Sequence, residues 1–313
     1  MLNLHDIQNE IENIELEDQS VSTGGNFPAR RIPMGLHPAR LVRYIELGDH
    51  PQKAYQGVDK DDAPMVALTF EFLGKKTVTE ATEEKPEYAM QKTIVIKKSS
   101  HEKATYRKLF DKMRAGDTTI TNMLQMVGVG KWLMKVEWTQ NNKVLKAADV
   151  EAAEAKSKAE PDNKELKIWD SIRNDTGYMI TAPYVDKFDE ETGETATVAV
   201  PVREPISGLA AFIWETPNPK FWASIHIEGS YTKTVNGKEE EVSKNRWQNM
   251  CIEATNYNGS ALQTMLDGTD AIGAAVIAET PEEEKPTKEE KAAEPVAAAT
   301  PSEEDDLMAD LGL

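Results

Sequence analysis

Apolar and polar residues alternate through the middle of the chain in a pattern that predicts several β-strands. Three runs rich in β-branched and aromatic residues are separated by Gly, Pro and charged turn residues, and they lie at 39–47, 64–73 and 90–98. These runs predict a β-meander. A fourth run, at 131–138, alternates charged residues with Trp, Met and Val, and this period of two predicts another strand.

One helix is predicted between the third and the fourth strand. Residues 99–116 begin with two serines suited to capping and end at Gly116. Their apolar side chains share one helical face, formed by Tyr106, Leu109, Phe110 and Met113. Three strands, a helix and a further strand is the order of an OB-fold, a small Greek-key barrel that binds oligonucleotides. The predicted fold class is therefore mainly β with accessory helices (α+β), an OB-fold-like barrel with insertions.

Further elements are predicted around this barrel from local composition and turn signals. They are a short helix at 119–128, a solvated helical insertion at 147–165, a hairpin joining 178–185 to 195–202, strands at 209–215 and 224–235, and a helix at 243–257 that Ser243 caps and that carries Trp247, Cys251 and Ala254 on one side.

Composition divides the chain into three segments: 1–38, 39–270 and 271–313. The first combines an acidic amphipathic helix with an extended lead-in, and the second is the β-rich body. The third is expected to be a disordered acidic tail with an apolar tip, because from residue 280 it is rich in Glu, Pro and Ala, has almost no large apolar residue before Leu307 and so cannot bury a core. The helix of the first segment presents Leu4, Ile7, Ile11 and Ile14.

Length and cysteine content point to an ordinary intracellular protein. A chain of 313 residues can bury a core without disulfides, and the single cysteine, Cys251, has no intramolecular partner. The first residues show no basic start followed by an apolar run, and no apolar stretch reaches the length of a membrane helix. We therefore expect a cytoplasmic protein with no membrane association, in the host-cell cytoplasm if the protein is viral.

The net charge of −18 would ordinarily exclude a nucleic-acid partner, but its distribution changes that inference. Residues 1–20 hold six acids and no bases, and residues 279–313 hold twelve acids and three lysines. Between residues 21 and 278 there are 36 acids and 33 bases, a net charge of −3. A body that is nearly neutral can carry a basic face that binds phosphates.

Catalytic and metal motifs are weak in this sequence. The five histidines are far apart, and there is no HExxH or CxxC spacing. The GVGK at 128–131 lacks the spacing of a phosphate loop, and the aspartates at 59–62 lack the glycine and distal glutamate of an EF-hand. We therefore expect a protein that is not an enzyme and that holds no cofactor or metal.

Basic residues interleaved with aromatic residues on the predicted strands are the strongest functional signal. Cations neutralise phosphates while aromatic faces stack on bases, and single-strand binders use both. Alternation also places both tryptophans of the fourth strand opposite its lysines, which favours the core for these two rings and makes the basic residues the better candidates. The candidate DNA-binding residues are Arg40, Arg43, Tyr44, Lys97, Lys98, Lys131, Trp132, Lys135, Trp138 and Arg246.

The segments FEFLGKK, SSHEKATYRKLFDKM and HIEGSYTKTVNGKEEEVSKNRWQN, together with the acidic tail, resemble single-stranded DNA-binding proteins of tailed bacteriophages. The resemblance implies a body that coats single-stranded DNA without sequence specificity in replication, recombination or repair. It also implies a tail that recruits replication or recombination proteins and competes with DNA for the basic groove. Homo-oligomerisation is left open.

The end of the tail departs from that family. Bacterial homologues finish with acids followed by Pro and Phe, whereas this chain ends EEDDLMADLGL. The candidate partner-binding residues are Asp305, Asp306, Leu307, Met308, Asp310, Leu311 and Leu313.

Two other classes of function remain open from the sequence. In the first, the protein is a phage structural or adaptor protein whose acidic ends are docking arms and which binds no DNA. In the second, it is a metal-dependent nuclease, for which Glu46, Asp49, Glu71 and Glu137 are the available carboxylates, with no pattern that brings them together.

Overall fold

The computed structural model describes residues 31–272, apart from residues 56, 84, 161–162, 189–192 and 236–237. Its strands are β1 (Gly35–Tyr55), β2 (Val58–Phe72), β3 (Val78–Thr79), β4 (Tyr88–Lys97), β5 (Trp132–Gln140), β6 (Lys143–Val144), β7 (Ile168–Ser171), β8 (Arg173–Asn174), β9 (Gly177–Tyr178), β10 (Ile180–Thr181), β11 (Tyr184–Phe188), β12 (Thr195–Ala199), β13 (Ala210–Phe212), β14 (Ser230–Val235) and β15 (Lys238–Ser243). Its helices are α2 (Thr105–Arg114), α3 (Val150–Ala159), α4 (Pro219–Ser224), α5 (Arg246–Ile252) and α6 (Ala261–Ile272), with 3₁₀ turns η1 (Met123–Met126), η2 (Ala147–Asp149) and η3 (Lys164–Leu166).

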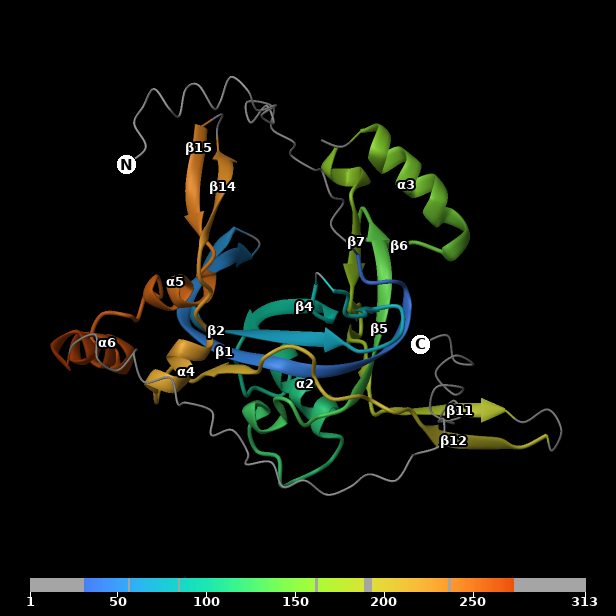
Figure 1. Ribbon diagram of the computed structural model, residues 1–313, viewed down its shortest axis with the longest axis horizontal. Coiled ribbons are helices and arrows are strands. Elements are labelled where there is room, and N and C mark those ends of the chain that lie inside the picture. The colour runs from blue at the N-terminus through green and yellow to red at the C-terminus, as the bar shows by residue number, and fades with distance from the viewer. Residues whose placement is uncertain are drawn as a thin grey trace, which may run out of the picture. The chain divides into compact units, whose positions relative to one another are not determined.

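The long strand β1 organises the main sheet (Figure 1). It pairs antiparallel with β2 over almost its whole length and with β5 through its first five residues, while β13 runs parallel to it at residues 43–45. Gly48 lies at a bulge of β1 with φ near +80°, and a Cβ there would meet the ring of Trp214 at 2.7 Å. Glycine is therefore the residue that allows the outer layer to approach this strand.

The strand order of the main sheet is β10-β5-β1-β2-β4-β3, with α2 in the chain between β4 and β5. Its two sides, β4 on one and the chain from β7 to β10 on the other, share no strand pairing in the described chain. A side-chain contact connects these two sides instead. Lys92 on β4 forms an ion pair with the carboxylate of Asp170 on β7 and also donates a hydrogen bond to the Asp170 carbonyl. The described strands therefore do not close into a barrel.

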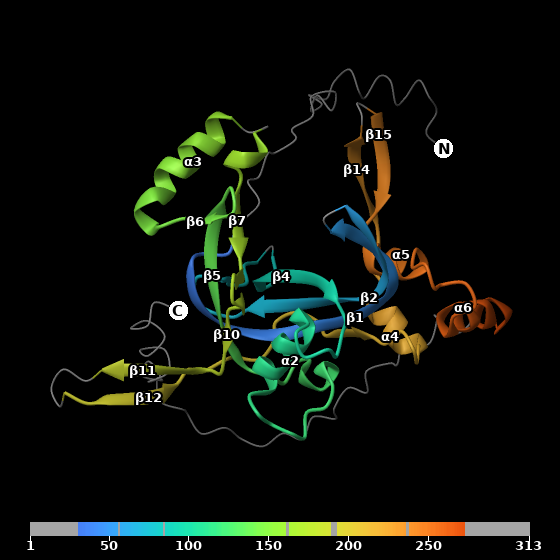
Figure 2. The same cartoon turned by 180° about the vertical axis from the view of Figure 1, so that it is seen from behind.

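The main core lies between the inner face of this sheet and α2, which lies beneath β1 and β2 in both views of the ribbon (Figures 1 and 2). Val66, Leu68, Phe70 and Phe72 of β2 point into this core, and the whole stretch from Val66 to Phe72 is buried because its other face is covered as well. The helix contributes its predicted apolar face, and this prediction is confirmed. The largest contributors to the core include Leu41, Tyr44, Leu68, Phe70, Phe72, Leu109, Phe110, Met113, Trp132 and Met134.

A second apolar layer covers the opposite face of β1 and β2. It is built from β13, α4, α5 and α6, which follow the sheet in the chain and gather at one end of it (Figures 1 and 2). Trp247 and Cys251 on α5 are buried there, as predicted for that helix. Ile45 and Leu47 of β1 point into this layer, so both faces of the strand are covered.

The buried thiol of Cys251 gives a simple test of this layer. Its Sγ donates to the Glu46 carbonyl at 3.6 Å, and burial raises the pKa of the thiol to about 12. Because the thiolate is the reactive form, we expect iodoacetamide to label the native protein very slowly at pH 8 and the urea-unfolded protein at the rate of a free thiol. Rapid labelling of native protein would contradict the packing of α5 on β1.

Most predicted elements are present, and several boundaries differ. Helix α2 begins six residues after Ser99, and its N-cap is Ala104, which makes no side-chain capping hydrogen bond, so the predicted serine cap is wrong. Ser224 ends α4 rather than starting a strand, and Asn245, not Ser243, precedes α5. The insertion at 147–165 is helical as predicted, while β1 begins at Gly35, inside the predicted lead-in.

Two predictions fall outside the described residues. The amphipathic helix at the N-terminus lies wholly within residues 1–30, and the partner-binding residues of the tail lie within 273–313. Among the helices that the structure does describe, none combines the length and apolar character needed to cross a membrane.

Candidate nucleic-acid interface

Arg40 belongs to the interior of the fold and not to a DNA-binding surface. Its side chain is 2% exposed, and its guanidinium donates to the carbonyls of Gly128 and Arg203 at 2.7 Å and of Val202 at 3.1 Å, and pairs with Glu204 at 2.7 Å. A phosphate cannot reach donors that are enclosed in this way. We therefore remove Arg40 from the candidate interface.

The aromatic candidates are also committed to the fold. Tyr44 is buried, donates to Glu46 at 2.7 Å, and has a raised pKa because burial and this carboxylate both oppose ionisation. Trp132 is buried and donates from Nε1 to the Met113 carbonyl at 2.9 Å, and its ring meets Phe70 edge to face. Trp138 is partly buried against the main core and donates to the Ile32 carbonyl at 2.7 Å. The rings of Tyr44 and Trp132 therefore present no face for stacking a base, and the indole N–H of Trp138 is held by the backbone.

Arg43 and Arg246 lie on the outer layer. Arg43 lines a cavity of about 220 Å³ together with Ser224 and Trp247, and the Arg246 guanidinium stacks 4.2 Å above the Trp247 ring centroid. The ring of Trp247 is itself buried. These two arginines are thus near one another but apart from the lysines of β4 and β5.

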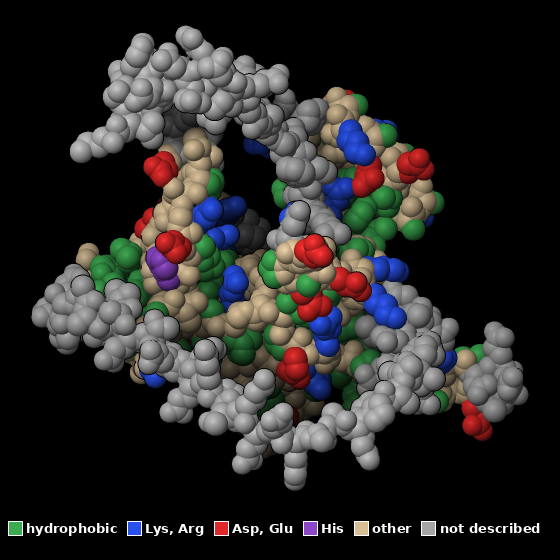
Figure 3. Space-filling view, in the orientation of Figure 1, with side chains coloured by type: hydrophobic (Ala, Val, Ile, Leu, Met, Phe, Trp, Pro, Cys, Tyr) green, Lys and Arg blue, Asp and Glu red, His purple; other side chains and the backbone are tan. Residues whose placement is uncertain are grey.

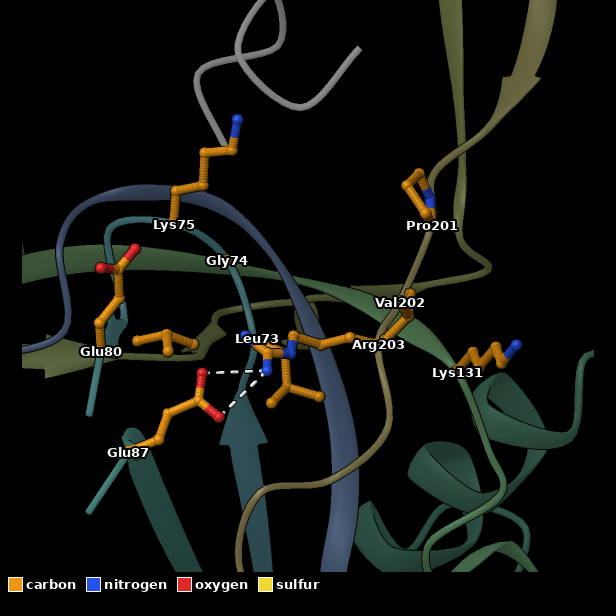
Figure 4. A pocket seen from close by; sticks show the side chains of 10 residues that line it. Leu73, Gly74, Lys75, Glu80, Glu87, Lys131, Pro201, Val202 and Arg203 are labelled. Atoms are coloured by element: carbon orange, nitrogen blue, oxygen red, sulfur yellow. Dashed lines mark hydrogen bonds and ion pairs between the residues drawn. The ribbon is translucent and has the colours of Figure 1, made fainter. Parts of the chain in front are cut away.

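Lys131 lines a second cavity of about 650 Å³ in which positive and negative charges are mixed. Arg203 and Glu87 form an ion pair of 3.0 Å across it, and the Lys75 and Lys131 side chains point outward on either side (Figure 4). Lys135, further along β5, pairs with Glu137 at 2.8 Å. Acidic neighbours make both places poorer phosphate sites than their lysines suggest.

Lys97 lies at a third cavity, of about 460 Å³, which opens between the end of β4 and the β8–β9 hairpin. We call it the seam cavity. Its charged and polar lining side chains are cationic or neutral, and no carboxylate lines it. The lining residues are Met65, Val95, Ile96, Lys97, Ser99, His101, Ala104, Thr105 and Arg173.

Local strand geometry explains which side chains reach the seam cavity. Val95 and Lys97 alternate with Ile94 and Ile96, which pack on the main core, so the first pair faces out. Lys98, the next residue, turns inward and pairs with the buried Glu46 at 2.5 Å. Arg173 follows the buried Ile172 and lies over the Tyr178 ring at 5.8 Å.

The candidate cations are therefore distributed over three places and not gathered in one groove. Figure 3 shows the same pattern, with Lys and Arg side chains spread over several parts of the visible face. Among the candidates, Lys97 and Arg43 line cavities free of carboxylates, and the Lys97 cavity is the larger, at about 460 Å³ against about 220 Å³, and also contains Arg173. Sequence reasoning missed its partners His101 and Arg173, although His101 lies in the segment that was read as a helix start.

No group of three or more His, Cys, Asp or Glu side chains in the described part of the chain is placed to hold a metal ion. Comparison with known proteins gives no further guide: no family model matches this sequence, and no curated protein or solved structure is significantly similar to it.

Proposed function

We propose that this protein binds single-stranded DNA without sequence preference and that it is a binding protein rather than an enzyme. The observation that carries this proposal is the seam cavity, where Lys97 and Arg173 meet the exposed apolar surface of Val95 with no lining carboxylate. Two cations and an apolar floor suit a chain of phosphates and unpaired bases.

The strand order supports the proposal. In the described chain, β1 lies between β2 and β5, and α2 follows the third long strand, which is the arrangement expected of an OB-fold-like body. The Lys92–Asp170 ion pair joins the two unpaired sides of the sheet. In this proposal the family resemblance of the sequence also implies a role in phage replication, recombination or repair, in the cytoplasm of the host.

A charge-reversal pair tests the site. The double variant K97E/R173E should bind an oligo-dT strand at least about tenfold more weakly at low salt, because two attractive phosphate contacts become repulsive. The slope of log affinity against log salt should fall by about 1.4, since each phosphate contact on a single strand contributes about 0.7. Fluorescence anisotropy of a labelled oligo-dT at several salt concentrations measures both quantities.

The matched control is K75E/K131E, which reverses the same number of charges at the mixed cavity. It should weaken binding only modestly, through the change in net charge. A larger loss for this control than for K97E/R173E would place the interface at the mixed cavity and contradict the proposal.

A structural or adaptor role is the second candidate, and one observation favours it. Tyr184 and Phe188 lie four register positions apart, hence on the same face of the β11–β12 hairpin, and both are exposed; the hairpin projects from the sheet (Figure 1). An adaptor would use such a face for a protein partner. Wild-type protein that leaves oligo-dT anisotropy unchanged at low salt would favour this role. The recruiting function of the tail is a proposal under either reading.

A further inference from the structure

Trp169 has the largest exposed fraction given for a tryptophan in the described part of the chain. It precedes Arg173, a residue that lines the seam cavity, by four positions. Its side chain is 60% exposed on β7. The residues on either side of it turn inward: Ile168 is buried, and Asp170 pairs with Lys92. The indole of Trp169 must therefore point away from the core.

Trp169 lies in a row of three side chains across the sheet, and exposed cations precede and follow β7 in the chain. Trp169 pairs in register with Thr139, which on its other side pairs with the exposed Val144, so these three side chains form one row across the sheet. Lys167 and Arg173, which flank β7 in the chain, are both exposed. Neither cation forms an ion pair with any described residue.

Arg173 connects this face to the seam cavity. It follows Trp169 by four residues with a bend at Ile172, so their Cα atoms lie at most about 13 Å apart, and it lines the seam cavity together with Lys97. A strand whose phosphates contact Lys97 and Arg173 can therefore continue along β7 toward Lys167 and pass over the indole of Trp169.

We propose that Trp169 stacks on an unpaired base of the DNA strand held at the seam cavity, and that this contact makes the protein prefer single strands over duplex. The inference rests on the proposed function and adds to it the residue that distinguishes the two forms of DNA. Stacking on an aromatic side chain requires an open base face. In a duplex both faces of each base are already covered by its neighbours, so only the phosphate contacts remain.

The test compares W169A with W169F and with F188A, the last being an equally exposed aromatic on the β11–β12 hairpin. W169A should bind oligo-dT roughly tenfold to a hundredfold more weakly, which is the range of one lost base stack. Its affinity for duplex DNA and its salt slope should equal those of the wild type, because no cation is removed. W169F should recover most of the affinity, and F188A should match the wild type.

The outcomes separate this inference from the proposed function. If K97E/R173E weakens oligo-dT binding but W169A does not, the protein binds DNA and Trp169 is not a stacking residue. If W169A weakens single-strand and duplex binding equally, or lowers the salt slope, Trp169 acts by placing the cations and the inference fails. If wild-type protein binds neither form of DNA, both proposals fall together.

Discussion

Replacing Arg40 by alanine should lower the free energy of unfolding by about 3–5 kcal/mol, as expected when a buried, fully bonded charge is deleted from its partners. The guanidinium donates to carbonyls in two segments that are distant in the chain, residues 128–129 and residues 202–203. Without it, these carbonyls lose their donors, and each buried group left unsatisfied costs about 1–3 kcal/mol. Urea denaturation followed by far-UV circular dichroism measures the change.

The control for R40A is R43A on the same strand. Arg43 is only partly buried, and its side chain forms no hydrogen bond or ion pair with the described residues, so R43A should cost less than about 1 kcal/mol. An R40A protein as stable as R43A would show that the interior position of Arg40 is wrong.

The contrast between these two arginines shows where the sequence pattern is sufficient and where it fails. Strict alternation from Ala39 puts Arg43 on the face of Leu41 and places Arg40 opposite. The pairing of β1 with β2 has an irregularity between Leu41 and Arg43, which shifts the faces of the strand. In addition, both faces are covered, so every residue from 39 to 42 is buried. The bulge and the second apolar layer are tertiary features, so they cannot be predicted from the alternation of apolar and polar residues along the strand.

The elements that the sequence predicted best are long and strongly patterned. The strands now described as β1, β2, β4 and β5 were each visible as runs of eight or more residues, and the preference of Trp132 for the core followed from alternation alone. These predictions succeeded because each run is long and rich in β-branched and aromatic residues bounded by turn residues, a signal that survives burial on one face or on both.

The seam cavity could not be predicted in the same way. Arg173 belongs to β8, a strand of two residues, and its neighbours β9 and β10 are equally short. Segments of this length contain no period. Their position depends on pairing with β5 and on contacts such as the bond from Lys112 Nζ to the Tyr178 carbonyl, which joins α2 to β9. The exposure of Trp169 could not be predicted for the same reason, because β7 has only four residues and shows no clear alternation.

Glu46 should be the second residue whose loss strongly destabilises the fold. Its carboxylate is 3% exposed and accepts hydrogen bonds from the Tyr44 hydroxyl at 2.7 Å, from Lys98 at 2.5 Å and from the backbone N–H of Trp214 at 3.1 Å. It therefore joins β1, the end of β4 and the outer layer at one point. The E46A variant leaves these donors without an acceptor, and we expect it to lose about 3–5 kcal/mol in urea denaturation.

Two companion variants show whether the charge of Glu46 or its hydrogen bonds matter. E46Q keeps an acceptor of the same size but removes the negative charge that faces Lys98, so its loss should lie between that of E46A and the wild type. Y44F removes the hydrogen bond to Glu46 and the 3.3 Å contact with the Tyr106 hydroxyl, and should cost about 1–2 kcal/mol. Because Lys98 turns inward to Glu46 while Lys97 faces the seam cavity, folded E46Q should bind oligo-dT at least as well as the wild type. An E46Q protein that is fully stable but loses DNA binding would contradict this expectation. It would mean that DNA binding depends on the Glu46–Lys98 ion pair and not on Lys97 alone.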